Sequence, residues 1–221
     1  MGPFRMPAPD DIRCVVFDIG ETLVDESRMW ALMADRVGVP RFTVMGMIGA
    51  LIERGEDHRG VWSLLGVPAP EPIALELGDL YPDARPCLRR LRERGFSVGL
   101  AGNQPERIAD DLRDAGMDAD FIASSSAWGV QKPASEFFER VVRTAKEPPA
   151  RILYVGDRLD NDVLPARAAG MRTAFIRRGP WGHVHARRED ADLADVRIDD
   201  LTQLVAILAR GADGAGSEAR D

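Results

Sequence analysis

The sequence has little cysteine and no long apolar run. Cys14 and Cys87 are the only cysteines among 221 residues, and their separation matches no metal-ligand spacing. Two free thiols are typical of a protein kept in the reducing cytoplasm. No stretch approaches the ~20 apolar residues that a membrane helix needs, and residues 1–11 hold no apolar segment long enough for a signal peptide. We therefore expect a soluble, cytoplasmic protein without a membrane partner.

Positive charge is also in the minority. The sequence contains 29 lysines and arginines and 36 aspartates and glutamates, which gives a formal net charge of −7. An acidic surface repels phosphate backbones, so the composition argues against nucleic acid as a partner. With 45% hydrophobic and 29% charged residues, the chain has the composition of a globular protein, and its length suits one full domain with a smaller insertion. Oligomeric state is not indicated by these features.

Short β-branched and apolar runs alternate with segments of helical periodicity. Six runs are expected to be strands, at residues 12–17, 96–101, 121–123, 152–155, 173–176 and 196–198. Four helices are expected between them, at residues 84–94, 106–115, 135–145 and 162–169. Such alternation predicts an α/β fold, with a parallel sheet covered by helices on both faces.

Two parts of the chain depart from this alternation. Between Thr22 and Pro82 we expect three helical segments, at residues 29–37, 43–54 and 57–65, and no strand. A helical block directly after the first strand is best explained as an inserted lid. Residues 210–221 are rich in Gly, Ala and charge without periodicity, and are expected to form a disordered tail.

Polar residues stand where the predicted strands end. Asp18, Gly102, Asn103, Asp157 and Asp162 lie at or shortly after the ends of predicted strands. Lys132 lies in the loop before the helix expected at residues 135–145. Because the carboxyl ends of parallel strands form one rim, we expect three carboxylates and a lysine to converge there. Oxygen ligands beside a lysine suit Mg²⁺ and a phosphoryl group. Without a divalent cation the carboxylates would repel one another, or some would have to be protonated.

Four segments, in this order along the chain, carry a family resemblance. They are residues 16–23 (VFDIGETL), Gly102-Asn103, Lys132-Pro133, and Gly156-Asp157 with Asp162 five residues later, followed by the AxxAG run of residues 166–170. Together they resemble the haloacid-dehalogenase-like superfamily. The resemblance covers residues 12–178. It implies a Rossmann-like core at residues 10–22 and 83–209, with a small helical cap at residues 23–82.

The resemblance also implies a mechanism. Asp18 would attack phosphorus and form an aspartyl-phosphate, while Lys132 would balance the charge of nucleophile and phosphate. Mg²⁺ would be held by Asp18, the main-chain carbonyl of Gly20 and Asp157, with Asp162 behind these ligands. Backbone N–H groups near Gly102 and Asn103 would bind the phosphate oxygens. The substrate would be a small phosphorylated metabolite selected by the cap.

Two positions depart from the pattern of the family's phosphatases. These usually carry a second aspartate two residues after the nucleophile, where this chain has Gly20, and a Ser or Thr hydroxyl where it has Gly102. The missing aspartate normally supplies general acid–base catalysis, worth roughly 10²–10⁴-fold. Glu21 is a candidate substitute, with the alternative that it is a solvent-facing residue of the loop into the cap. Poor leaving groups should react slowly, and an aspartyl-phosphate should persist.

The sequence leaves several functions open. The first is a Mg²⁺-dependent phosphohydrolase with weakened or altered general acid–base catalysis, which the retained Asp18, Lys132 and Asp157 favour. The second is a catalytically degenerate relative that binds a phosphorylated ligand or a partner without turnover, which Gly20 and Gly102 favour. The third is phosphoryl transfer to an acceptor other than water. Dehalogenation is disfavoured by the metal-ligand aspartate, since the dehalogenases of the superfamily work without a metal.

One pair of histidines, His183 and His185, follows the fifth predicted strand. Two residues apart, they would face one way in an extended segment, where a pair of this kind can bind metal. No third ligand stands near them in the sequence, so we expect an exposed loop instead.

Overall fold

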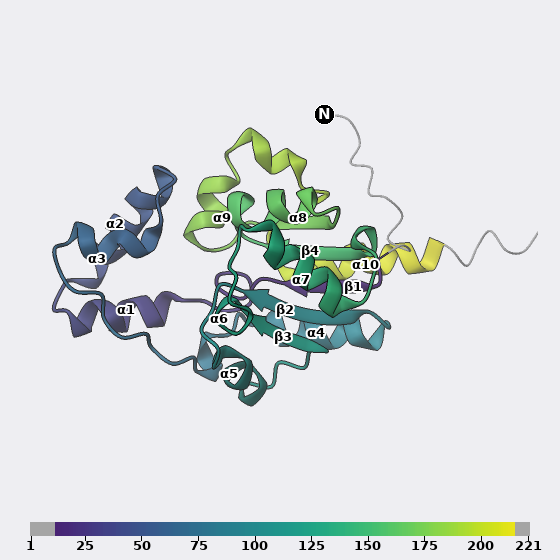
Figure 1. The fold of residues 1–221 in the computed structure, drawn as a ribbon, viewed down its shortest axis with the longest axis horizontal. Coiled ribbons are helices and arrows are strands. Elements are labelled where there is room, and N and C mark those ends of the chain that lie inside the picture. Colours follow the sequence, from purple (N-terminus) through teal and green to yellow (C-terminus); the bar gives the residue numbers. More distant parts are fainter. Residues whose placement is uncertain (1–11, 215–221) are drawn as a thin grey trace, which may run out of the picture.

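The computed structural model describes residues 12–214, which form a six-stranded parallel sheet in the order β3-β2-β1-β4-β5-β6 (Figure 1). The strands are β1 (Cys14–Phe17), β2 (Ser97–Gly102), β3 (Phe121–Ser124), β4 (Ile152–Gly156), β5 (Arg172–Ile176) and β6 (Val196–Ile198). The order reverses between the central strands β1 and β4, which is the place where open α/β sheets bind ligands. The predicted α/β, Rossmann-like fold is confirmed.

Helices cover both faces of the sheet, because side chains along each strand alternate between two apolar cores. Val15 and Phe17 of β1 belong to one core, and Cys14 and Val16 belong to the other. The first core lies beneath α4 (Ala84–Glu93), α5 (Ile108–Asp114) and α10 (Leu201–Gly214), and the second beneath α7 (Ser135–Ala145) and α8 (Leu164–Ala168). The short helix α6 (Ser125–Trp128) follows β3.

The chain between β1 and α4 is helical, as predicted. It contains α1 (Ser27–Arg36), α2 (Arg41–Glu53), a 3₁₀ turn (His58–Gly60), α3 (Val61–Leu64) and a second 3₁₀ turn (Leu77–Asp79). These helices build an apolar cluster of their own around Val44, Ile52 and Trp62, and the cluster extends to Trp181 after β5. Figure 1 shows α1, α2 and α3 displaced to one side of the sheet. None of the helices within residues 12–214 combines the length and apolar character that a membrane crossing requires.

The exposed-loop prediction for the histidine pair is wrong for His185. Residues Gly179–His185 form helix α9, in which His183 is exposed and His185 is buried. His185 Nδ1 accepts a hydrogen bond from the Leu159 N–H at 3.0 Å. A proline in the first helical turn favours the helix, and the Leu159 donor supplies a polar partner inside the protein.

Two helix boundaries also differ from the prediction. The helix expected at residues 162–169 is α8, and it is preceded by a π-helical turn at Leu159–Val163. Helix α10 continues to Gly214, so residues 210–214 are helical where we expected the tail to begin. The rest of that tail, from residue 215, lies outside the described residues, as does the N-terminal segment in which we expected no signal peptide.

Candidate active site

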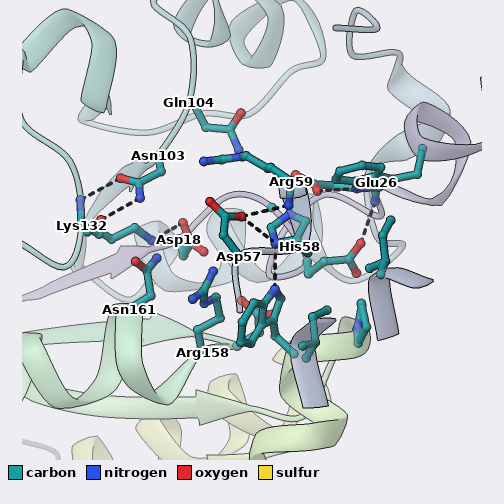
Figure 2. Close-up of a pocket in the computed structure, with 18 of the residues that line it drawn as sticks. Asp18, Glu26, Asp57, His58, Arg59, Asn103, Gln104, Lys132, Arg158 and Asn161 are labelled. Carbon is teal, nitrogen blue, oxygen red and sulfur yellow. Dashed lines mark hydrogen bonds and ion pairs between the residues drawn. The ribbon is translucent and has the colours of Figure 1, made fainter. Parts of the chain in front are cut away.

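The ends of β1, β2 and β4 bring the predicted site residues to one pocket of about 340 Å³ (Figure 2). The pocket is lined by six of them, Asp18, Gly20, Glu21, Asn103, Lys132 and Asp157. The other two, Gly102 and Asp162, lie next to these lining residues. An ideal Cβ on Gly102 would lie 2.7 Å from Asp18 Oδ1, and Asp162 forms an ion pair with Lys132. All eight therefore gather at the switch point of the sheet.

Lys132 is buried between two carboxylates. Its Nζ lies 2.6 Å from Asp18 Oδ1 and 2.5 Å from Asp162 Oδ1, and the residue is 2% exposed. Burial by itself would lower the pKa of Lys132, but the charges of Asp162 and Asp18 raise it well above the usual value. The ammonium group is therefore charged at neutral pH and held against Asp18 in the protein interior.

Three aspartates have the spacing to share a cation. One carboxylate oxygen from each of Asp18, Asp157 and Asp162 lies within 4.8 Å of the others. Burial raises the pKa of Asp157, and the nearby charges of Asp162 and Asp18 raise it further. Its Oδ2 atom is buried and has no hydrogen-bond partner among residues 12–214. Three buried carboxylates facing one lysine leave excess negative charge, so this donor set fits a hard divalent cation such as Mg²⁺.

The turn after β4 holds Asp162 in place. It packs the Asp162 side chain against Gly156, where an added Cβ would lie 2.5 Å from Asp162 Cβ. Asp162 Oδ2 accepts a hydrogen bond from the Arg158 N–H at 3.0 Å, while Oδ1 binds Lys132. Since both oxygens already have protein donors, Asp162 has less capacity for direct metal coordination than Asp157.

The amide side chain of Asn103 is engaged by the main chain of Lys132. Asn103 Oδ1 accepts from the Lys132 N–H at 2.8 Å, and Nδ2 donates to the Lys132 carbonyl at 3.0 Å. The sequence indicated phosphate contacts for this segment but not this side-chain role. The phosphate donors predicted here are main-chain N–H groups, and the pairing does not occupy them.

Both carboxylate oxygens of Glu21 have protein partners. Oε2 accepts from the Tyr81 hydroxyl at 2.7 Å, and Oε1 accepts from the Glu26 N–H at 3.0 Å. The residue has a left-handed φ of 53°, and its side chain fills the space beside Gly179. Burial raises the pKa of Glu21 to about 7, although the hydrogen bond from Tyr81 lowers it. Glu21 is thus not the solvent-facing residue that the sequence allowed.

Glu26, at the start of α1, lines the pocket and was missed by sequence reasoning. Its Oε1 occupies the space beside Gly20, where an ideal Cβ would overlap it. Its Oε2 accepts from Trp30 Nε1 at 3.1 Å, and burial raises the pKa of Glu26. No motif marks this residue, because only the turn between β1 and α1 brings it back to Gly20.

Aromatic side chains join the helical segment to the sheet at the pocket. Trp181 Nε1 donates to His58 Nδ1 at 3.1 Å, and the guanidinium of Arg158 lies 3.7 Å over the Trp181 ring. The His58 ring in turn packs edge-on against Trp30, with centroids 5.3 Å apart. These residues line the same pocket as Asp18. Their contacts join distant segments, so the sequence did not indicate that they meet one another.

Comparison with known proteins identifies one family. A family model described as haloacid dehalogenase-like hydrolase matches residues 12–170. The chain is 30% identical to the glyceraldehyde 3-phosphate phosphatase of Methanopyrus kandleri, over 89% of this chain and 97% of that protein. It is 31% identical to a phosphoglycolate phosphatase of Pseudomonas putida, over 91% and 82%. The crystal structure of a defluorinating L-2-haloacid dehalogenase shares the fold, with a TM-score of 0.65 and 22% identity over 94% of this chain and 100% of that one. The chain therefore belongs to the haloacid dehalogenase-like hydrolases, and it is a hydrolase of the phosphatase type.

Proposed function

We propose that the protein is a Mg²⁺-dependent phosphohydrolase that acts on a small phosphorylated metabolite through an aspartyl-phosphate on Asp18. The observation that carries this proposal is the buried ion pair of Asp18 with Lys132, next to Asp157, where β1 and β4 end. The two relatives named above support the substrate class, because both are phosphatases of small metabolites by name.

The metal would be held by the carboxylates of Asp18 and Asp157 and the main-chain carbonyl of Gly20, with Asp162 behind them. When bound, Mg²⁺ supplies positive charge that offsets the carboxylates and the phosphoryl oxygens. The unpartnered, buried Oδ2 of Asp157 supports this assignment, since such an oxygen is costly to bury without a partner.

The chain's own groups would carry two chemical steps. In the first, a carboxylate oxygen of Asp18 forms a bond to phosphorus, while the bond from phosphorus to the leaving oxygen breaks and that oxygen takes up a proton. In the second, a water molecule gives up a proton and attacks phosphorus, the bond to Asp18 breaks, and inorganic phosphate leaves. Lys132, 2.6 Å from Asp18 Oδ1, would offset the negative charge of the nucleophile and of the phosphoryl group. Main-chain N–H groups near Gly102 and Asn103 would bind the phosphoryl oxygens.

We also propose that residues 23–82 act as a cap that selects the substrate, over a core of residues 10–22 and 83–209. The pocket lining supports this division, because Trp30, Ile48 and His58 come from the helical segment while Asn103 and Arg158 come from the core. A substrate bound at Asp18 would therefore contact both parts.

A second candidate is a degenerate family member that binds a phosphorylated ligand without turnover. Glycine at positions 20 and 102 favours it, since neither the usual acid–base carboxylate nor the usual hydroxyl can come from these residues.

A screen of phosphate esters and acyl phosphates with Mg²⁺ tests the two candidates, with the Asp18→Asn variant as control. We expect the parent to release phosphate from at least one compound and the variant to release none above background. Equal background in both proteins would overturn the phosphatase proposal. Saturable binding of a phosphorylated compound in that case would support the second candidate.

A further inference from the structure

The carboxylate of Glu26 stands where the family's second aspartate is missing. An ideal Cβ built on Gly20 would overlap Glu26 Oε1, and would lie 3.1 Å from Glu26 Cδ and 3.5 Å from Gln104 Nε2. The gap between that Cβ and Oε1 is close to the two-bond separation of Cβ and a carboxylate oxygen within an aspartate. A carboxylate carried by position 20 could therefore reach the point that Glu26 Oε1 occupies. The absence of a side chain at Gly20 is what makes room for Glu26.

The turn after β1 fixes Glu26 in this position. Its Oε2 is held by Trp30 Nε1 at 3.1 Å, and its N–H donates to Glu21 Oε1 at 3.0 Å. Glu21 is itself held by the Tyr81 hydroxyl at 2.7 Å. Glu26 Oε1 is the carboxylate oxygen beside Gly20, and both residues line the pocket that contains Asp18. Figure 2 shows Glu26 and Asp18 in this pocket.

Glu26 also lies between two cavities. Besides the pocket at Asp18, it lines a second cavity of about 360 Å³. The walls of this cavity are largely apolar and include Met29, Met33, Trp62, Ile73, Leu75 and Ile108. A phosphate ester with its phosphorus at Asp18 and its alcohol extending toward this cavity would present its bridging oxygen to Glu26.

We propose that Glu26 is the general acid and base of this enzyme, and that Glu21 positions it; the proposal rests on the phosphatase function proposed above. In the first step, the Glu26 carboxyl gives its proton to the bridging oxygen as the phosphorus–oxygen bond breaks and the bond from Asp18 to phosphorus forms. In the second step, the Glu26 carboxylate takes a proton from the water that attacks phosphorus. The bond from phosphorus to Asp18 then breaks, and inorganic phosphate leaves.

The Glu26→Gln variant tests the proposal, because it keeps the shape and the acceptor for Trp30 but cannot transfer the proton. On an alkyl phosphate, whose leaving group needs protonation, we expect kcat/KM to fall by roughly 10²–10⁴-fold. On p-nitrophenyl phosphate, whose leaving group needs little help, we expect a much smaller loss in kcat/KM. The same variant should show a burst of p-nitrophenol and accumulate phosphorylated protein, because water attack has lost its base. Equal losses on both substrates, or no loss on the alkyl phosphate, would overturn the proposal.

A pair of further variants separates chemistry from folding. Glu26→Ala should lose alkyl phosphate hydrolysis. Adding Gly20→Asp to this variant should raise kcat/KM on the alkyl phosphate by about tenfold or more, because the new carboxylate fills the vacated space. The control is Glu56→Gln, an exposed glutamate paired with Arg54, which should match the parent on both substrates. If the parent shows no Asp18-dependent phosphate release, the phosphatase function itself fails. If the parent is active and Glu26→Gln matches it, only the role of Glu26 fails.

Discussion

Asn103 and Lys132 hold each other through two hydrogen bonds of opposite direction, the Lys132 N–H to Asn103 Oδ1 and Asn103 Nδ2 to the Lys132 carbonyl. The pair ties the end of β2 to the loop that precedes α7. It therefore fixes the main chain of the lysine whose ammonium group neutralises Asp18. Parallel strands bring these two segments to one rim, and the amide side chain locks them together.

Replacing Asn103 with Ala should leave the Lys132 N–H and carbonyl without partners in a mostly buried place. We expect the free energy of unfolding to fall by about 1–3 kcal/mol, and phosphatase activity to fall with it as the ammonium group loses its fixed position. Chemical denaturation and kcat on an active substrate measure the two effects. Ser126→Ala, an exposed change on the neighbouring helix α6, should alter neither. A stable Asn103→Ala protein with parent activity would contradict this account.

Asp157→Asn should abolish the response to Mg²⁺. In the parent, Mg²⁺ at a hundred times its dissociation constant should stabilise the fold by about 2.7 kcal/mol, because only the folded chain assembles the three aspartates. The variant should lose that gain. In the absence of metal it should be more stable than the parent, since it removes one of three buried, mutually repelling carboxylates. Thermal unfolding with and without Mg²⁺ measures both differences.

Asp160→Asn is the matched control for the metal prediction. Asp160 lies three residues away, is 45% exposed at its side chain, and pairs with Arg158 outside the cluster. This variant should keep the full Mg²⁺ response. An equal Mg²⁺ response from Asp157→Asn and the parent would rule out the proposed ligand.

Gly102→Ala should damage the site even though the family usually carries a larger residue there. The added Cβ would lie 2.7 Å from Asp18 Oδ1, and a shift of that oxygen would disturb its 2.6 Å contact with Lys132. We expect a loss of about 1–3 kcal/mol in unfolding free energy from overpacking, together with lower kcat/KM. Gly46→Ala is the control, since a Cβ at this exposed position in α2 meets nothing within 4 Å. Parent-like kcat/KM in Gly102→Ala would show that Asp18 has another usable position.

The sheet and its rim could be predicted from the sequence because their signals are local. Each buried strand is a short apolar run, and the order of runs and helices dictates parallel pairing. Asp18 and Asp157 stand directly after two such runs, and the strand order then places them together. Lys132 was predicted from its loop, and its burial between two carboxylates follows from the same rim.

The residues that escaped prediction act through contacts that no local pattern encodes. Glu26 reaches Gly20 only because the chain reverses in a tight turn with a left-handed Glu21. His185 is buried, and its Nδ1 accepts a hydrogen bond from the Leu159 N–H, 26 residues earlier in the chain. Periodicity describes one element at a time, so side chains that bridge two elements become visible only when the elements are packed.

His58 should make the contact between the helical segment and the sheet sensitive to acid. The pKa of His58 is lowered from 6.5 to about 4, mainly by burial and also by the positive charges of Arg59 and Arg158, while Asp57 opposes the shift. Its Nδ1 must be unprotonated to accept the Trp181 hydrogen bond. A histidine whose folded pKa is depressed binds a proton more readily once it is exposed. Its contribution to stability is therefore complete above pH 6.5 and is lost as the pH falls toward 4.

The measurement is the unfolding free energy of the parent and of His58→Gln as the pH falls through this range. The parent should lose more stability than the variant, by up to about 3 kcal/mol, because glutamine does not titrate. His185 also has a pKa lowered to about 4, but it is present in both proteins and cancels in the difference. His183→Gln, at the exposed histidine, should follow the parent curve. Parallel curves for the parent and His58→Gln would mean that His58 is as free to take up a proton in the folded chain as in the unfolded one.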